Sequence, residues 1–363
     1  MKGWPYPLPS LGWGVPGFLG QRAIPSGPPI SVPVNTTIPA ITGTYRSGET
    51  LTSSTGTWTN TPSSYAYQWQ RDGADIVGQT ASTYVVTPTD IPALLACIVV
   101  ATNDGGDSLP ATSAAVSSPL RAIYQIDPNA RVWVHTQGTG VSVGNPVATW
   151  TSADGLYTLE QSITANRPTR EADGVSLNGI NNELRGDSSA SILNGAYTVC
   201  TSVTDISSSQ TGTRQLWGNY TDGVSSGVRR CSHVNLSRPN APLAARMRYL
   251  LGGNSTSRVI SLASLAPIGN AGPYNLAFRS GVPGSGTADA LELVDPLELV
   301  GSAVWPAVAI VNDLHTLGAE RRTSATVAKW WEGTVQHHLI LGLECSDAQL
   351  DTIRDALAAE AAL

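Results

Sequence analysis

Paired carboxylates are the first residues in this chain that could do chemistry, since a glycosidase places two of them across a glycosidic bond. A β-sandwich enzyme needs that pair on one strand face, which requires even spacing along the strand. Glu292, Asp295 and Glu298 are spaced by three instead, and Pro296 interrupts the stretch. We interpret the stretch as a turn flanked by Leu and Val. Only two carboxylates facing each other in a groove would favour a polysaccharide-degrading enzyme.

The pattern Gly-x-Ser-x-Gly, which carries the nucleophile of many hydrolases, occurs at 140–144 and 223–227. That nucleophile requires a strand, a sharp turn and a helix in succession. Asn145-Pro146 follows the first match, and no helical periodicity follows the second. Because the chain is rich in Gly and Ser, we attribute both matches to chance. We therefore predict no catalytic residue and expect that the chain is not an enzyme.

Histidine and cysteine show no metal-ligand spacing. His337 and His338 are adjacent on a predicted strand, so we expect one to face the core and the other to be exposed. The cysteines contain no Cys-x-x-Cys pair, which disfavours a structural zinc site; they are Cys97, Cys200, Cys231 and Cys345. We assign Asp104 and Asp107 to a turn rather than to calcium. The sequence thus predicts no metal and no cofactor.

An aromatic ring beside amide and carboxyl groups is the combination expected of a sugar-binding surface, where the ring stacks on sugar C–H groups. Trp217, Asn219, Tyr220 and Asp222 bring these residue types together in one Gly-rich stretch. We take these four residues as the candidate glycan site. A hairpin with packed aromatics is the alternative interpretation.

Charge is scarce in this chain of 363 residues, of which 13% are charged, with a net charge of −6 and two lysines. A nucleic-acid binder needs Lys and Arg to neutralise phosphates, so the composition argues against that class. No apolar run is long enough to span a membrane. The 36 Gly and 24 Pro residues, together with abundant Ser and Thr, predict a turn-rich, all-β protein.

Residues 1–30 are rich in Pro and Gly, and no helix can run through them because Pro removes backbone donors and fixes φ. The segment lacks the pattern of a signal peptide. Its large apolar residues favour a peptide that lies in a groove of another protein; they include Trp4, Tyr6, Leu8, Leu11, Trp13 and Phe18. We predict that this segment anchors the chain to an assembly. The alternative is a tail folded onto its own chain.

Residues 31–119 change to short strands with frequent turns. Tyr65, Tyr67 and Trp69 alternate with Ala and Gln, and this period of two predicts one buried face. Asp72-Gly73 predicts a tight turn between two strands.

These residues resemble the immunoglobulin-like domains of phage and bacterial surface proteins. The resemblance rests on Gly56-Thr57-Trp58, Tyr67-x-Trp69-x-x-Asp72-Gly73, Tyr84 and the strand from Cys97 to Asn103. It implies a core that contains Trp58, Trp69 and Cys97. The chain departs from antibody domains because Cys97 has no partner cysteine, and Leu95 replaces the tyrosine usual at that position. Such domains serve mostly as spacers and adhesive modules.

Residues 120–363 continue with strand patterns, of which 335–343 (VQHHLILGL) is the strongest. Ser346 and Gln349 then form a capping box. Leu350, Ile353 and Leu357 recur at helical spacing, so we predict a short helix over 347–361.

The order of these elements resembles the concanavalin A-like, laminin-G-like jelly-roll domain. The resemblance rests on 166–169 (NRPT), 173–186 (DGVSLNGINNELRG) and Trp331-Glu332-Gly333 before the last strand. Related domains bind glycans or form adhesive tips, and some are glycosidases. We therefore expect an all-β chain, in which an immunoglobulin-like sandwich is followed by a concanavalin A-like jelly-roll sandwich.

An apolar tail, a spacer and a lectin-like sandwich in this order resemble accessory surface proteins of tailed phages and gene transfer agents, of the head-fibre, spike or decoration type. The resemblance implies a virion surface protein assembled in the bacterial cytoplasm. Its tail would bind other virion proteins in a homo-oligomer or multicopy assembly, and its distal domain would bind host surface polysaccharide through many weak sites. The alternatives are a purely structural virion component without glycan binding, a polysaccharide-degrading enzyme and a secreted bacterial adhesin.

Overall fold

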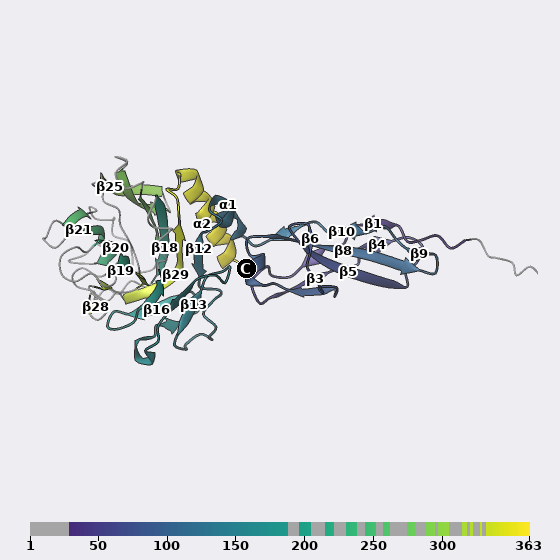
Figure 1. Ribbon diagram of the computed structural model, residues 1–363, viewed down its shortest axis with the longest axis horizontal. Coiled ribbons are helices and arrows are strands. Elements are labelled where there is room, and N and C mark those ends of the chain that lie inside the picture. The colour runs from purple at the N-terminus through teal and green to yellow at the C-terminus, as the bar shows by residue number, and fades with distance from the viewer. Residues whose placement is uncertain are drawn as a thin grey trace, which may run out of the picture.

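The computed structural model describes residues 29–187, 196–204, 215–220, 230–237, 244–251, 257–261, 274–280, 288–294, 297–304, 314–317, 320–321, 327–328 and 332–363. Strands dominate these residues, and their α-helices are α1 (Arg121–Ile126) and α2 (Asp347–Ala361). The predicted all-β class with a short C-terminal helix is confirmed (Figure 1).

The first part of the chain is an immunoglobulin-like sandwich of short antiparallel strands. Its longest strands are β5 (Ser64–Arg71) and β8 (Leu94–Asn103), which pair with each other. The others are β1 (Asn35–Thr37), β2 (Ile41–Thr42), β3 (Thr50–Ser53), β4 (Thr57–Trp58), β6 (Ala74–Asp75), β7 (Thr83–Val85), β9 (Gly106–Asp107), β10 (Ala111–Thr112) and β11 (Val116–Ser117). One sheet has the order β10-β8-β5-β6 and the other β2-β3-β7, while β1 pairs β4.

Trp69 lies at the centre of this sandwich. It is fully buried, pairs in register with the fully buried Cys97, and stacks on Tyr84 with ring centroids 5.4 Å apart. Trp58 is half-buried and packs against the same core. Tyr65 departs from the predicted buried face because it lies near the start of β5, at the end of the sheet, where it is 37% exposed.

The second part of the chain is a sandwich of two eight-stranded antiparallel sheets. One sheet has the order β15-β16-β29-β18-β23-β24-β25, with β12 also paired to β29. Its strands are β12 (Arg131–Val134), β15 (Thr169–Arg170), β16 (Val175–Asn178), β18 (Tyr197–Thr204), β23 (Tyr274–Ser280), β24 (Ala288–Val294), β25 (Leu297–Val304) and β29 (Glu332–Leu341).

The facing sheet has the order β13-β14-β17-β26-β19-β20-β21-β22. Its strands are β13 (Thr149–Thr151), β14 (Thr158–Glu160), β17 (Leu184–Asp187), β19 (Gln215–Tyr220), β20 (Arg230–Ser237), β21 (Ala244–Leu251), β22 (Ser257–Ser261) and β26 (Leu314–Leu317). The short strands β27 (Glu320–Arg321) and β28 (Val327–Ala328) form a separate pair.

The strongest predicted strand and the predicted helix are both present. Strand β29 begins at Glu332, three residues before the predicted start, because its first residues pair with β16. Helix α2 has the predicted capping box, in which Gln349 N donates to Ser346 Oγ at 3.3 Å and Ser346 N donates to Gln349 Oε1 at 2.8 Å. These bonds satisfy two backbone donors that would otherwise be unpaired at the helix start.

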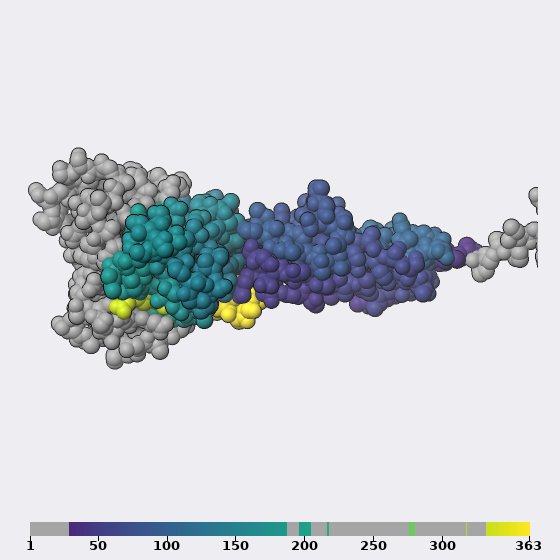
Figure 2. All heavy atoms as spheres, turned by 90° about the horizontal axis from the view of Figure 1, so that it is seen from below, coloured from purple at the N-terminus to yellow at the C-terminus, as the bar shows by residue number. Residues whose placement is uncertain are grey.

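The two sandwiches lie end to end in an elongated molecule (Figure 2). The C-terminal residue and helices α1 and α2 lie at their junction, whereas β9 lies at the opposite end of the first sandwich (Figure 1). The predicted anchor, 1–30, lies outside the described residues except for its last two positions. Among the described helices none is both long and apolar enough to cross a membrane.

Candidate functional site

The predicted glycan site is wrong at Trp217, which is buried. On β19 it is 2% exposed, and its ring centroid lies 6.0 Å from that of Phe278 and 6.4 Å from that of His338. A ring packed between two sheets offers no face to a sugar, so Trp217 is a core residue. The alternative interpretation, a hairpin with packed aromatics, fits this residue better, since β19 pairs with β20 in an antiparallel register.

The side chains of the other predicted glycan-binding residues lie outside the described part of the structure. The backbones of Asn219 and Tyr220 belong to β19, but their side chains lie outside the described residues, as does Asp222. The six apolar anchor residues also lie outside them: Trp4, Tyr6, Leu8, Leu11, Trp13 and Phe18.

The carboxylate stretch falls on two paired strands. Strand β24 ends at Val294 and β25 begins at Leu297, and Leu293 lies opposite Glu298 across the ladder. Glu292 lies opposite Leu299 in the same ladder. Asp295 and Pro296, between the two strands, lie outside the described residues.

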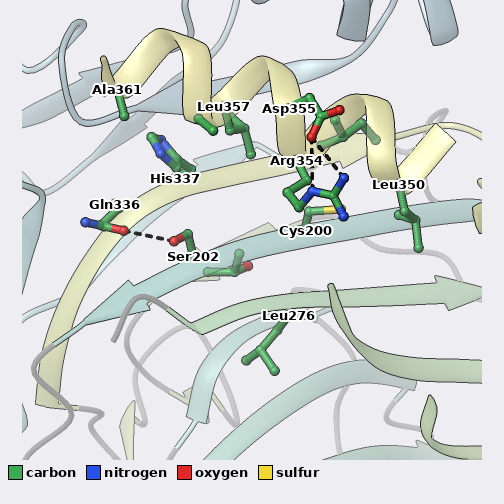
Figure 3. Close-up of a pocket in the computed structure, with 13 residues that line it drawn as sticks. Cys200, Ser202, Leu276, Gln336, His337, Leu350, Arg354, Asp355, Leu357 and Ala361 are labelled. Carbon is green, nitrogen blue, oxygen red and sulfur yellow. Dashed lines mark hydrogen bonds and ion pairs between the residues drawn. The ribbon is translucent and has the colours of Figure 1, made fainter. Parts of the chain in front are cut away.

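His337 and His338 point to opposite faces of β29, as predicted, but both are buried. His338 faces the core, where its ring lies 5.7 Å from that of Trp133 and its Nδ1 lies 2.9 Å from Thr201 Oγ1. His337 is 5% exposed, and its ring lies 5.2 Å from that of His135. The expectation that one of the pair is exposed is wrong, because α2 lies over the face that carries His337 (Figure 3).

These three imidazoles are uncharged at neutral pH. Burial lowers the pKa of His337 and that of His338 to about 3, and the neighbouring His135 adds to the effect at His337. Burial lowers the pKa of His135 to about 4, with the charges of Arg170 and Arg46 acting in the same direction and Asp173 against it. Within the described part of the chain, no group of His, Cys, Asp and Glu side chains could hold a metal ion.

Glu360 brings together three segments at the junction of the two sandwiches. Its side chain is fully buried at the end of α2. Oε1 accepts hydrogen bonds from Arg46 Nε at 3.0 Å, from Thr136 Oγ1 at 2.9 Å and from Gln137 Nε2 at 3.1 Å. Arg46 Nη2 also donates to the backbone oxygen of Glu360 at 2.8 Å. The loop before β3 is thereby bonded directly to the second sandwich.

A second charge cluster holds the end of the first sandwich that faces the junction. Asp90 is fully buried and accepts from Arg71 Nε at 2.6 Å and from Tyr84 Oη at 2.8 Å. Burial alone would raise the pKa of Asp90, but hydrogen bonds from Thr87, Arg71 and Tyr84 outweigh it and hold the pKa below its usual value. Tyr45 donates to the backbone oxygen of Asp90 at 3.0 Å, which fixes the residue beside Arg46.

Apolar contact is continuous across the same junction. Leu51 and Trp69 of the first sandwich belong to one buried cluster with Leu120, Ile123 and Leu350 of the second part. Gly155 of the second part also lies directly against Pro88 of the first sandwich, since a Cβ added to Gly155 would lie 2.9 Å from Pro88 Cβ. Gly155 also has a φ of +76°, which favours glycine there. The two sandwiches are therefore in direct contact through apolar packing and a buried ion pair, and are not separated by a flexible linker.

The helical spacing in the C-terminal sequence contains a signal for Glu360 beyond the predicted helix itself. Glu360 continues the helical spacing of Leu350, Ile353 and Leu357, so it lies on the buried face of α2. A carboxylate on an apolar helix face requires a partner, because an unpaired buried charge is very unfavourable. Its partner Arg46 could not be identified from the sequence, since the pair is 314 positions apart.

Comparison with known proteins gives no family. No protein-family model matches the chain, and no curated protein matches it. The solved structures that it resembles include Trypanosoma rangeli sialidase in complex with 2,3-difluorosialic acid, at 14% identity and a TM-score of 0.43. That match covers 72% of this chain and 42% of the sialidase.

Two further structures are similar at the same level. Trypanosoma rangeli sialidase shows 12% identity and a TM-score of 0.41, over 87% of this chain and 52% of its own. The CBM40 of Ruminococcus gnavus IT-sialidase, bound to α2,3-sialyllactose, shows 14% identity and a TM-score of 0.36, over 50% of this chain and 92% of its own. The chain thus spans about half the length of the sialidases.

The expectation that the chain is not an enzyme is corrected by these structures, because the Trypanosoma rangeli proteins that it resembles are sialidases, which are enzymes. At 12–14% identity, this likeness concerns the fold and gives this chain no reaction, substrate or catalytic residue.

Proposed function

We propose that the chain is a surface protein of a tailed-phage or gene-transfer-agent particle, which its N-terminal segment attaches to the particle and whose second sandwich meets glycans of the host cell surface. The observation that supports this proposal is the position of the first described residues relative to the second sandwich. Strand β9, beside which Ile30 lies, and the second sandwich are at opposite ends of the immunoglobulin-like sandwich (Figure 1).

Specific contacts fix the N-terminal end of this arrangement. Asn103 Nδ2 donates to the backbone oxygen of Ser31 at 2.9 Å, and Asn60 Nδ2 donates to that of Val32 at 2.7 Å. Gly105, in the turn between β8 and β9, lies directly against Ile30, so a side chain there would clash with the Ile30 backbone oxygen. Residues 30–32 are therefore held at the β9 end of the sandwich.

The opposite end of β8 lies toward the second sandwich. Strand β8 has 10 residues and so separates the two ends by about 30 Å, at ~3.3 Å per residue. At the junction, the Arg46–Glu360 pair and the shared apolar cluster restrict bending. A spacer that is stiff as well as long holds a binding domain away from the surface to which the chain is attached.

Composition supports the glycan part of the proposal. With 13% charged residues and only two lysines, the surface relies on Ser, Thr, Asn, Gln and Gly for polar contact. Neutral hydrogen-bonding groups suit sugar hydroxyls, and many weak contacts gain strength when many copies are displayed together.

The test uses the full chain in two measurements. It should copurify with particles from the strain that encodes it, and the purified chain should bind surface polysaccharide extracted from the host. Copurification without polysaccharide binding would contradict the glycan part of the proposal and favour a purely structural component of the particle. Failure to copurify would contradict the proposal. Assaying the bound polysaccharide for released sugar, with heat-denatured chain as the control, would distinguish a polysaccharide-degrading enzyme.

A further inference from the structure

Helix α2 does not fill the space between itself and the sheet beneath it. A cavity of about 360 Å³ remains there, with walls from α2 and a floor from β18, β23 and β29 (Figure 3). This volume lies in the range of small-molecule sites, which begins at about 300 Å³. The cavity is far from the β9 end of the molecule, and its lining includes His337 and Leu350, which are described above.

The lining of the cavity is mostly apolar. Leu350, Ile353 and Leu357 of α2 line the wall, and Leu276 of β23 lines the floor. A polar strip crosses this floor, in which Ser202 Oγ donates to Gln336 Oε1 at 3.0 Å. The surroundings favour a ligand with an apolar body and little polar surface.

The charged side chains at the rim pair with one another within the helix itself. Arg354 Nη1 lies 2.7 Å from Asp351 Oδ1, and Arg354 Nη2 lies 2.9 Å from Asp355 Oδ1. One cation and two carboxylates leave this group with one net negative charge. The rim therefore disfavours an anionic ligand.

His337 is the buried polar group of the cavity that has an unused hydrogen-bonding atom. The residue is 5% exposed, and its Nδ1 is buried without a hydrogen-bond partner in the described structure. Leaving such an atom unpaired is unfavourable. The ring of His135 lies 5.2 Å away on one side, and its own Nδ1 also lacks a partner. Because His337 is uncharged at neutral pH, one of its ring nitrogens can accept a hydrogen bond while the other carries the proton.

We propose that this cavity binds a small uncharged alcohol or phenol, whose apolar body contacts the leucines of α2 and whose hydroxyl forms a hydrogen bond with the ring of His337. The apolar body would fill the cavity between α2 and the sheet. This inference goes beyond the proposed surface function and does not depend on it.

Two fluorescent probes test the proposal on the full chain. 2-Naphthol carries the hydroxyl, while 2-methoxynaphthalene has the same rings and no O–H donor. We expect 2-naphthol to bind in a saturable, one-to-one manner, and the ether to bind about fivefold more weakly, the loss expected for one hydrogen bond. Absence of saturable 2-naphthol binding would overturn the site, and equal binding of the two probes would overturn the role of His337.

A matched pair of helix variants locates the binding. Ala358 lines the cavity and Ala359 does not, although both are exposed on α2. Ala358→Trp should reduce 2-naphthol affinity at least tenfold, whereas Ala359→Trp should leave it unchanged. Equal effects of the two substitutions would place the probe elsewhere and refute the proposal. His337→Phe should abolish the difference in affinity between 2-naphthol and 2-methoxynaphthalene. If that variant does not fold, the comparison of Ala358→Trp with Ala359→Trp still tests whether the cavity is the binding site.

Discussion

Arg46 and Glu360 lie 314 positions apart in the chain, yet Arg46 Nε is 3.0 Å from Glu360 Oε1 and Glu360 is fully buried. One residue belongs to a loop of the immunoglobulin-like sandwich, and the other to the last turn of the C-terminal helix. Glu360 Oε2 has no hydrogen-bond partner in the described structure, so the carboxylate depends on the bonds to Oε1. The ion pair therefore couples the positions of the two sandwiches.

Loss of Arg46 should destabilise the protein strongly. Arg46→Ala leaves the Glu360 carboxylate buried with only the neutral donors Thr136 and Gln137. Removing one partner of a buried pair typically costs about 3–5 kcal/mol. We expect a fall of about 3 kcal/mol in the free energy of unfolding, measured by urea denaturation.

The control for this prediction is an exposed ion pair. Asp355→Ala breaks the contact with Arg354, where the Asp355 side chain is 72% exposed, and should cost no more than about 1 kcal/mol. The double variant Arg46→Met/Glu360→Met removes both charges and should recover most of the stability. A double variant as unstable as Arg46→Ala would show that burial of the lone carboxylate is not the cause.

The core of the first sandwich should depend on Trp69 far more than on Tyr65. Trp69 is fully buried against Cys97 and Tyr84, so Trp69→Ala should lower the free energy of unfolding by about 3–5 kcal/mol. Tyr65→Ala, on the same strand face but 37% exposed, should cost about 1 kcal/mol or less. Denaturation followed by tryptophan fluorescence measures both, and similar losses would contradict this description of the core.

Acid should destabilise the protein through its buried histidines. The folded-state pKa is about 4 for His135 and about 3 for His337 and His338, below the ordinary value of about 6.5. As pH falls below about 6.5, the unfolded chain takes up protons that the folded chain does not, so stability decreases until the pH reaches about 3. At His338 the cause of the low pKa is burial, because its ring is enclosed by Trp133, Trp217 and Thr201.

Urea denaturation between pH 7 and pH 4 measures this slope. Each histidine contributes up to about 1.4 kcal/mol per pH unit below its unfolded pKa. His337→Phe removes one titrating group, so its stability should fall less steeply with acid than that of the unsubstituted chain. Parallel slopes for the two proteins would show that His337 is not held in its neutral form.

Asp90 should act in the same direction as the histidines but at lower pH. Its pKa is held below the ordinary value of about 3.9, so its carboxylate stabilises the fold above that pH, and the stabilisation is lost as pH falls through the folded-state pKa. Asp90→Asn should cost about 2 kcal/mol at pH 7, because the charge-assisted bonds from Arg71 and Thr87 are weakened. The stability difference from the unsubstituted chain should shrink below about pH 4. A difference that is constant with pH would contradict the assignment.

Local patterns predicted the fold well where one element determines its own structure. The Ser346–Gln349 capping box and the spacing of Leu350, Ile353 and Leu357 define α2 without reference to the rest of the chain. The alternation on β8 likewise defines which of its side chains are buried. Both signals act over a few residues, which is why they can be read from the sequence.

The candidate sites could not be predicted in this way. Trp217 has the residue type of a sugar platform, but whether an aromatic ring faces solvent or a second sheet depends on strands distant in the sequence, such as the one that carries Phe278. His337 was expected to be either core-facing or exposed, yet it lies under a helix that begins after its strand ends. In both cases long-range packing determines the environment of the residue.

The most direct test of the proposed function is particle incorporation of a tail variant. In the full chain, Trp4, Tyr6, Leu8, Leu11, Trp13 and Phe18 are replaced by Ser, and the control replaces the exposed Val77, Leu109 and Leu156 by Ser. Quantitative mass spectrometry of purified particles then measures how much of each chain is incorporated. We predict normal incorporation of the control and loss of the tail variant at an unchanged melting temperature. Normal incorporation of the tail variant would contradict attachment through the N-terminal segment.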